Sequence, residues 1–238
     1  TTWQDGDEKR CIIFNMIIID GFLSPQIRHE VINDALFFPE PMGGGDRIAT
    51  EINSYHYEKS DCYAPFMFWD GWWRSPANTL KKRVIKEIWE NNIPFDLNDI
   101  LGIEYWTRTY LAGQYLDIHV DEDTFLYAES KVFAGPAIGS IYYGVDNEQG
   151  GFLEIHPTKL VDGTPLAIER DKMVDVAVSI DMRERIAYKG DRLIIFDAGH
   201  TPHASVQASS GIRQVMVCNV WHKDRPPTAL QLGEFHYE

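Results

Sequence analysis

Apolar residues recur at helical spacing in two stretches of the N-terminal part of the chain. In the first stretch, Ser24 and Pro25 supply an N-cap and a proline at the first helical position. The apolar stripe that follows consists of Ile27, Val31, Ile32 and Leu36. We expect a helix that buries this stripe, preceded by a strand over residues 11–19 that ends at Asp20 and Gly21.

The second stretch predicts a helix that begins at Ser75 and Pro76. Its buried stripe consists of Leu80, Val84, Ile85, Ile88 and Trp89. The opposite, solvated side carries Lys81, Lys82, Arg83 and Lys86. Between the two helices, residues 37–47 form a loop rich in proline and glycine, which is either a plain connection or a substrate lid. Residues 61–73 are dense in aromatic side chains, most of which we expect in the core.

After Pro94 the helical spacing gives way to short apolar runs separated by turn residues, and no further helix is expected. The predicted strands cover residues 102–111, 115–121, 137–144, 151–155, 164–168, 174–180, 184–189, 192–197 and 213–221. Helices first and many strands afterwards favour an α+β, mostly β protein whose helices pack on the outer face of a β-core. We interpret residues 1–238 as one domain, with a helical support region over about residues 20–95 and a β-core over about residues 100–222.

Charge and cysteine content narrow the class of protein. The 238 residues carry 36 acidic and 22 basic side chains, which gives a formal net charge of -14. Without a basic cluster, this charge argues against nucleic acid or an anionic membrane as a partner. The three cysteines lack metal-type spacing and indicate a reducing, cytoplasmic environment, with Cys11 and Cys218 inside strands. No apolar run is long enough to span a bilayer.

A histidine and an aspartate two residues apart, His119 and Asp121, stand in the segment LAGQYLDIHVD. In an extended segment both side chains lie on the same face, because side chains alternate with period two. With one distant histidine they match the 2-His-1-carboxylate triad, which holds non-haem Fe(II) and leaves coordination positions open. Because the pattern is short, the alternative is a surface histidine beside a solvated acidic cluster.

The segment RLIIFDAGHTPHASVQASSGIRQVMVCNVW supplies candidates for the missing groups. His200 and His203 are both candidates for the second imidazole, and His203 lies farther from the turn that follows the first strand of this segment. Arg213 is suited to holding a small carboxylate, because its planar guanidinium donates two parallel hydrogen bonds. A turn at residues 209–211 between two strands would bring His203 and Arg213 into one cavity. His156 is a further candidate ligand, although a structural role at a strand end is favoured.

Five motifs together resemble those of the 2-oxoglutarate- and Fe(II)-dependent dioxygenases, and most closely the prolyl-4-hydroxylase-like branch. They are Tyr110-x2-Gly113, His119-x-Asp121, Gly150-Gly151, His203-x9-Arg213 and Asn219-x-Trp221. The resemblance covers about residues 103–222 and extends weakly to the segment IIIDGFLSPQ. It implies a double-stranded β-helix, the jelly-roll or cupin-like fold, as the β-core.

The resemblance also implies roles for individual residues. His119, Asp121 and His203 would bind the iron and form the catalytic centre, and the interval to Arg213 favours His203 over His200. Arg213 would pair with the far carboxylate of 2-oxoglutarate, and Tyr110 would hydrogen-bond this cosubstrate. The glycine pair would shape a turn. The implied cofactors are Fe(II), 2-oxoglutarate and O2, with ascorbate as a further candidate.

The expected activity is that of an Fe(II)/2-oxoglutarate-dependent oxygenase, which abstracts hydrogen from an amino acid, a peptide or a small metabolite. It would release succinate and carbon dioxide. Hydroxylation, desaturation and ring formation all begin with this abstraction, so the motifs do not choose among them. The segment 156–191 is longer than is common in the branch, and Arg213 stands where lysine is frequent. Tyr115 lies one position away from the second tyrosine that is often seen in that branch. These departures argue against assuming proline as the substrate.

Two alternatives remain at this stage. One is a non-catalytic barrel that binds a small acid through Arg213. The other is a cupin-like metalloenzyme that does not use 2-oxoglutarate. Three aromatic residues near the motifs are expected in the core rather than along the cavity, namely Tyr105, Tyr142 and Trp221.

Overall fold

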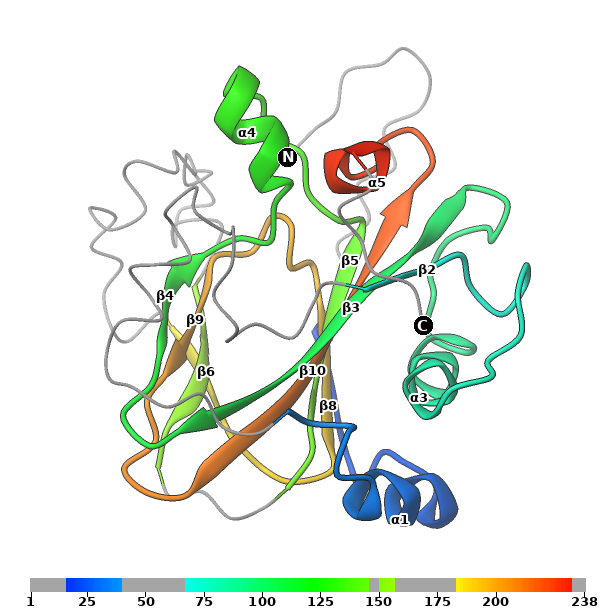
Figure 1. The fold of residues 1–238 in the computed structure, drawn as a ribbon. Coiled ribbons are helices and arrows are strands. Elements are labelled where there is room, and N and C mark those ends of the chain that lie inside the picture. Colours follow the sequence, from blue (N-terminus) through cyan, green and yellow to red (C-terminus); the bar gives the residue numbers. More distant parts are fainter. Residues whose placement is uncertain (1–15, 40–66, 146–149, 157–182, 233–238) are drawn as a thin grey trace.

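The protein folds into two antiparallel sheets that face each other, with helices outside (Figure 1). The computed structural model describes residues 16–39, 67–145, 150–156 and 183–232. The six-stranded sheet contains, in spatial order, β1 (Ile17–Asp20), β8 (Arg192–Phe196), β5 (Ile138–Tyr143), β10 (Ile212–His222), β3 (Ile100–Leu111) and β2 (Met67–Trp69). The four-stranded sheet contains β4 (Leu116–His119), β9 (His203–Val206), β6 (Phe152–Ile155) and β7 (Glu184–Ala187).

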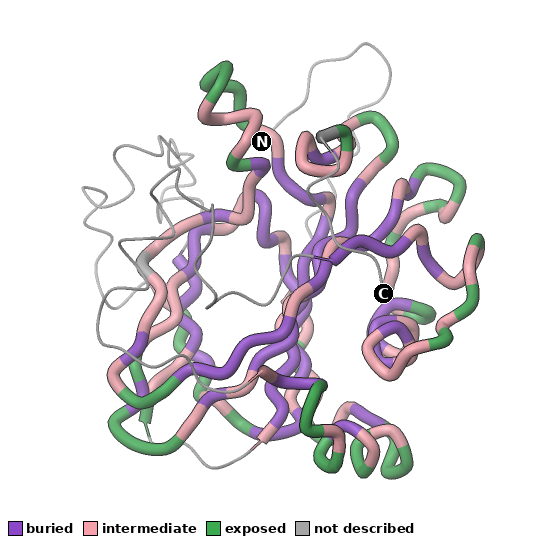
Figure 2. The backbone as a smooth tube through the Cα atoms, in the orientation of Figure 1, coloured by how far each residue is buried: buried purple, intermediate pink, exposed green. Residues whose placement is uncertain are grey.

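Alternation along β10 builds two hydrophobic layers, one on each side of the large sheet. Met216 and Cys218 pack into the layer between this sheet and the helices. Val215 and Val217 point the other way, into the layer shared with Leu153 and other residues of the small sheet. Figure 2 shows buried backbone running through both sheets. The predicted mostly β fold, a jelly-roll with helices on its outer face, is therefore confirmed.

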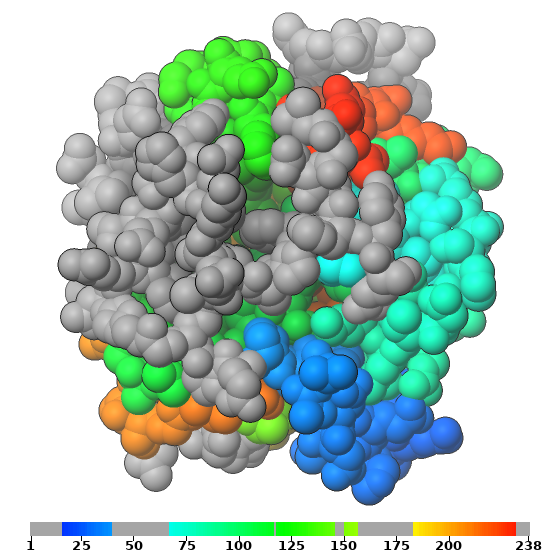
Figure 3. All heavy atoms as spheres, viewed as in Figure 1, coloured from blue at the N-terminus to red at the C-terminus, as the bar shows by residue number. Residues whose placement is uncertain are grey.

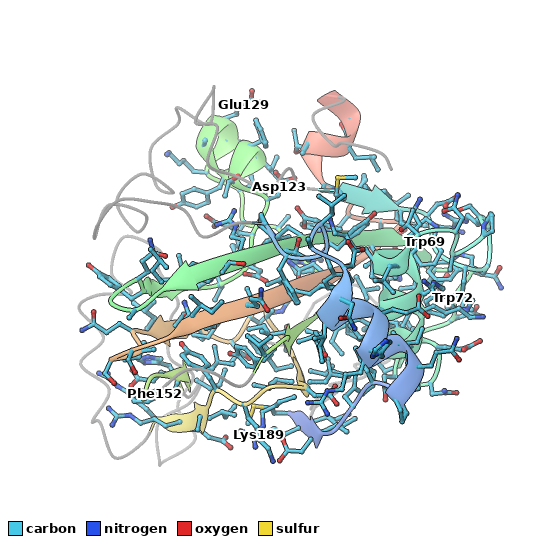
Figure 4. All side chains as sticks on the ribbon, turned by 60° about the horizontal axis from the view of Figure 1, so that its bottom comes forward. Trp69, Trp72, Asp123, Glu129, Phe152 and Lys189 are labelled. Atoms are coloured by element: carbon cyan, nitrogen blue, oxygen red, sulfur yellow. The ribbon has the colours of Figure 1, made fainter. Side chains whose placement is uncertain are left out.

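Four helices are named by their labels in Figure 1: α1 (Pro25–Asn33), α3 (Leu80–Trp89), α4 (Thr124–Ser130) and α5 (Thr228–Leu232). The predicted stripe of α3 supplies four fully buried residues, Val84, Ile85, Ile88 and Trp89. Figure 3 shows α1 and α3 on one flank of the molecule, and α4 with α5 at another end. At that end the Asp123 carboxylate accepts hydrogen bonds from the backbone N–H groups of Leu126 in α4 and Thr228 in α5 (Figure 4).

The first predicted helix is shorter than expected, and two of the four residues assigned to its buried stripe are exposed. The helix ends at Asn33, where the Asp34 side chain accepts the backbone N–H of Leu36 and turns the chain. Ile32 and Leu36 are consequently exposed, whereas Val31 is buried. Pro25 occupies the first turn as predicted, but the Ser24 side chain makes no capping hydrogen bond.

The second helix begins later than predicted, at Leu80. Ser75 lies in a turn, with its backbone N–H bonded to the carbonyl of Gly71, and the N-cap is Thr79, which accepts the N–H of Lys82. Lys82 was expected on the solvated side but is buried. Long lysine side chains cover apolar surface with their methylene stems, which explains burial beside the stripe.

Several short elements were not predicted. They are β2, of three residues, and the helices α4 and α5, whereas only strands were expected after Pro94. β9, of four residues, was expected without bounds, as the strand before the turn at residues 209–211. The predicted strand over 115–121 is also too long, because β4 ends at His119. The predictions for Cys11, for the strands at 164–168 and 174–180 and for most of the loop at 37–47 lie outside the described residues. In the part of the chain that the structure describes, no helix is long and apolar enough to cross a membrane.

Candidate metal centre

Two histidines and an aspartate meet at the end of the barrel where β4 leads towards α4 (Figure 1). His119 is the last residue of β4 and lies directly opposite His203, the first residue of β9. Asp121 follows two residues later, and its backbone N–H donates to the carbonyl of Ala198 at 2.9 Å. Strand pairing and this one backbone bond therefore bring together residues that are far apart in the sequence.

The three side chains converge on one point. Nε2 of His119 and Nε2 of His203 each lie 3.7 Å from Oδ1 of Asp121. The ligand atoms of the three residues all lie within 4.8 Å of one another, and no other described group of His, Cys, Asp or Glu converges in this way. The His119 side chain stays 31% exposed, whereas His203 is buried, so the site opens on the side of His119.

The protein holds His203 in the form that a metal requires. Its Nδ1 lies 2.9 Å from the carbonyl oxygen of Thr201, which can only accept, so Nδ1 carries the proton and Nε2 presents a lone pair towards Asp121. The ring of Phe196 packs edge-on against it at a centroid distance of 4.9 Å. Burial, and next the neighbouring His119, lower the pKa of His203 well below its ordinary value. The imidazole is therefore neutral at physiological pH.

The aspartate is oriented as well. Nδ2 of Asn219 donates to Oδ2 of Asp121 at 3.0 Å, which leaves Oδ1 towards the two imidazoles. Burial raises the pKa of Asp121, while His119 and the Asn219 hydrogen bond lower it. Two imidazoles and one carboxylate that converge on a single point fit a divalent metal ion of the non-haem iron type.

A buried arginine, which has no anionic partner among the described residues, lies between the same two sheets. Arg213, on β10, is 3% exposed, and its Nη1 donates to the hydroxyl of Tyr188. The guanidinium lies over the rings of Tyr110 and Tyr188, at 4.3 Å and 4.6 Å from their centroids. Its Nε and Nη2 are buried and have no hydrogen-bond partner among the described residues. A buried cation with two unused donors is suited to a carboxylate ligand.

The other candidates from the sequence lie elsewhere. His200 bonds Asp197 through Nδ1 at 2.9 Å and is not part of the cluster, and His156 is held by Glu154 at 3.0 Å. Gly150 and Gly151 both have positive φ, as a turn into β6 requires. The three aromatic residues expected in the core are buried in hydrophobic clusters, namely Tyr105, Tyr142 and Trp221.

Sequence reasoning missed three contributors to the site. The carbonyl of Thr201 is a backbone group, for which no residue type gives a signal. Tyr188 follows β7, and only the tertiary fold brings it to Arg213. Asn219 was part of a motif but had no assigned role, although period-two alternation along β10 places it on the same face as Arg213.

Solved structures to which the chain is similar include a prolyl-4-hydroxylase from Pseudomonas putida, with 12% identity, a TM-score of 0.49, and coverage of 87% of this chain and 92% of that chain. HygX from Streptomyces hygroscopicus, with nickel and 2-oxoglutarate bound, gives 12% identity, a TM-score of 0.48, and coverage of 87% and 82%. The 2-oxoglutarate complex of a viral collagen prolyl hydroxylase from Paramecium Bursaria Chlorella virus-1 gives 18% identity, a TM-score of 0.45, and coverage of 89% of this chain and 98% of that chain. No protein-family model and no curated protein matches the sequence.

Proposed function

We propose that the protein is an Fe(II)- and 2-oxoglutarate-dependent oxygenase with His119, Asp121 and His203 as its metal ligands. The observation that carries this proposal is the buried Arg213 with two unpartnered donor atoms, in the same barrel as the triad. A metal site alone has no use for such a cation, whereas a cosubstrate with a second carboxylate does.

Each residue has a defined task in this proposal. The two imidazoles and Oδ1 of Asp121 hold the ion, and Thr201 and Asn219 keep these atoms aimed at it. Arg213 binds the distal carboxylate of 2-oxoglutarate, and Tyr110 lies beside it, where it lines the cosubstrate pocket. When bound, Fe(II) with 2-oxoglutarate and O2 supplies the oxidation of a C–H bond, with succinate and carbon dioxide as coproducts.

The apolar surroundings limit water around the cosubstrate. Arg213 shares its side of the large sheet with Val215 and Val217, which belong to the hydrophobic layer between the sheets. A dry pocket strengthens the pairing of the guanidinium with a carboxylate, because both charges have lost their water. The substrate would be an amino acid, a peptide or a small metabolite that approaches the exposed side of His119.

The test is an anaerobic titration of the Fe(II)-loaded protein with 2-oxoglutarate, followed through the weak visible charge-transfer band of the chelate. Arg213→Ala should weaken 2-oxoglutarate binding by about 100-fold, because a buried charge-assisted pair is worth about 3 kcal/mol. His203→Ala should abolish the band. Arg185→Ala is the matched control, because Arg185 is a half-exposed arginine that pairs with Glu154.

Two results would contradict the proposal. One is an absence of the band in folded, iron-loaded wild type. The other is a band whose dependence on 2-oxoglutarate is the same in Arg213→Ala and wild type. Either result would favour a cupin-like barrel that binds a metal or a small acid without using 2-oxoglutarate.

A further inference from the structure

The carboxylate of Asp121 is held by a side chain for which the neighbouring strand makes room. Asn219 is 2% exposed and lies opposite Gly139 of β5. A Cβ atom at position 139 would lie 2.7 Å from Oδ1 of Asn219 and 2.6 Å from Cβ of Ala198. Even alanine at position 139 would therefore collide with the asparagine amide. Gly139 therefore leaves the room that the Asn219 amide occupies beside Asp121.

On its other side, Asn219 lies opposite a glutamate. Glu104 of β3 is its cross-strand partner, and Asn219 is close enough to lower the pKa of the Glu104 carboxyl group. The indole N–H of Trp221 donates to Oε2 of Glu104 at 2.9 Å. The Asn219 amide therefore lies between two acidic side chains: it donates to Oδ2 of Asp121 at 3.0 Å, and it lies directly across the strands from Glu104.

Burial of the Glu104 carboxyl group in this position is energetically unfavourable. Among the described residues no lysine or arginine pairs with it, and burial raises its pKa to about 7, with Asp121 and Asp123 adding in the same direction. A leucine or a methionine would fill such a position at lower cost. Its hydrogen bond from Trp221 and its position opposite Asn219 suit the glutamate to a specific task, which is to orient the asparagine.

We propose that Glu104, anchored by Trp221 and acting through Asn219, is a positioning residue for the metal-binding carboxylate of Asp121. The inference rests on the proposed function, because it assigns these residues to the metal site. Without Glu104 the Asn219 amide is free to turn away from Asp121, and Oδ1 is then no longer held towards the two imidazoles. Hydrogen-bonding partners of metal ligands affect metal affinity without touching the ion.

The experiment measures Co(II) binding to the metal-free protein by calorimetry, together with the visible ligand-field spectrum of the complex. Asn219→Ala and Glu104→Ala should each weaken Co(II) binding by about 10- to 100-fold and alter the spectrum. Glu104→Gln should stay close to wild type, because its side-chain carbonyl can accept the same hydrogen bond from Trp221 and lies opposite Asn219 in the same way. Ser140→Ala is the control: Ser140 is buried, donates to the carbonyl of Cys218, and lies on the opposite face of the sheet from the Asn219 side chain because side chains alternate along a strand.

Trp221→Phe provides a second route if the alanine variants do not fold. It removes only the indole donor and should weaken Co(II) binding in the same direction. Unchanged Co(II) affinity and an unchanged spectrum in Glu104→Ala or in Trp221→Phe would overturn the inference. Equal losses of Co(II) affinity in Glu104→Gln and Glu104→Ala would also overturn it, because they would indicate a role for the charge alone. Failure of wild type to bind Co(II) would instead refute the proposed metal site, so the two failures are distinguishable.

Discussion

At the scale of single residues, the interior of this barrel holds two buried ionisable side chains for which the described residues offer no partner of opposite charge. Arg213 is a buried cation that awaits an anion, and Glu104 is an acid whose surroundings favour its protonated form. The pKa of Glu104 in the folded protein, about 7, lies above its ordinary value of 4.5. The folded state therefore binds this proton more tightly than the unfolded chain does. The resulting stability is fully present below pH 4.5 and is lost as the pH rises to about 7.

The raised pKa of Glu104 should make the unfolding free energy depend measurably on pH. Between about pH 5 and pH 8, metal-free wild type should lose roughly 2 to 3 kcal/mol more unfolding free energy than Glu104→Gln, which cannot ionise. Urea unfolding of the two proteins at both pH values measures the difference. Parallel pH dependence in both proteins would show that Glu104 is ionised in the folded state throughout this range.

At the scale of elements, the start of α3 is the clearest case of local control. The side chain of Thr79 accepts the N–H of Lys82, whereas Ser24, at the start of α1, makes no side-chain cap. Thr79→Ala should therefore reduce the unfolding free energy by about 1 kcal/mol, and Ser24→Ala, its matched control, should change it by less than about 0.5 kcal/mol. Chemical denaturation of both variants tests this. Equal losses would mean that the cap is not the source of the effect.

Elements with a strong period were predictable, and the others were not. The stripe of α3 and the long strands β3 and β10 bury one side chain after another at the expected spacing. In contrast, α4 contains no buried residue, so the sequence TFLYAES carries no apolar stripe to detect. β2 and β9 are too short for alternation to stand out. In α1 the Asp34 turn overrides an apolar spacing that continues beyond the helix.

Some residues of the candidate site could likewise be predicted from the sequence, and others could not. The triad and Arg213 could be named because their spacing resembles a family pattern, and the structure brings the three candidate ligands together. Tyr188 and Glu104 could not be named, because their partners are fixed only when strands distant in the sequence pair. The contacts that a side chain makes after such pairing cannot be predicted from the residues next to it in the sequence.

At the scale of the whole molecule, the candidate metal site joins the two sheets. His119 and His203 belong to the small sheet, and Asp121 is tied to the large sheet through Asn219. An ion that binds only the folded state should stabilise it by about 1.4 kcal/mol for each tenfold excess of metal over its dissociation constant. Thermal unfolding with and without a chelator measures this shift, and His203→Ala should show none. A shift of equal size in that variant would place the bound ion elsewhere.

The pairing of His119 with His203 makes the hydrogen-bond register of β4 and β9 part of the chemistry. Side chains alternate between the faces of a sheet, so a slip of one residue between these strands would turn one imidazole outward and separate the pair. The ladder is irregular between Leu116 and His119, immediately before the first ligand. Such an irregularity re-aims the residue that follows it. The alignment of the ligands is therefore set by the backbone of the small sheet before any ion arrives.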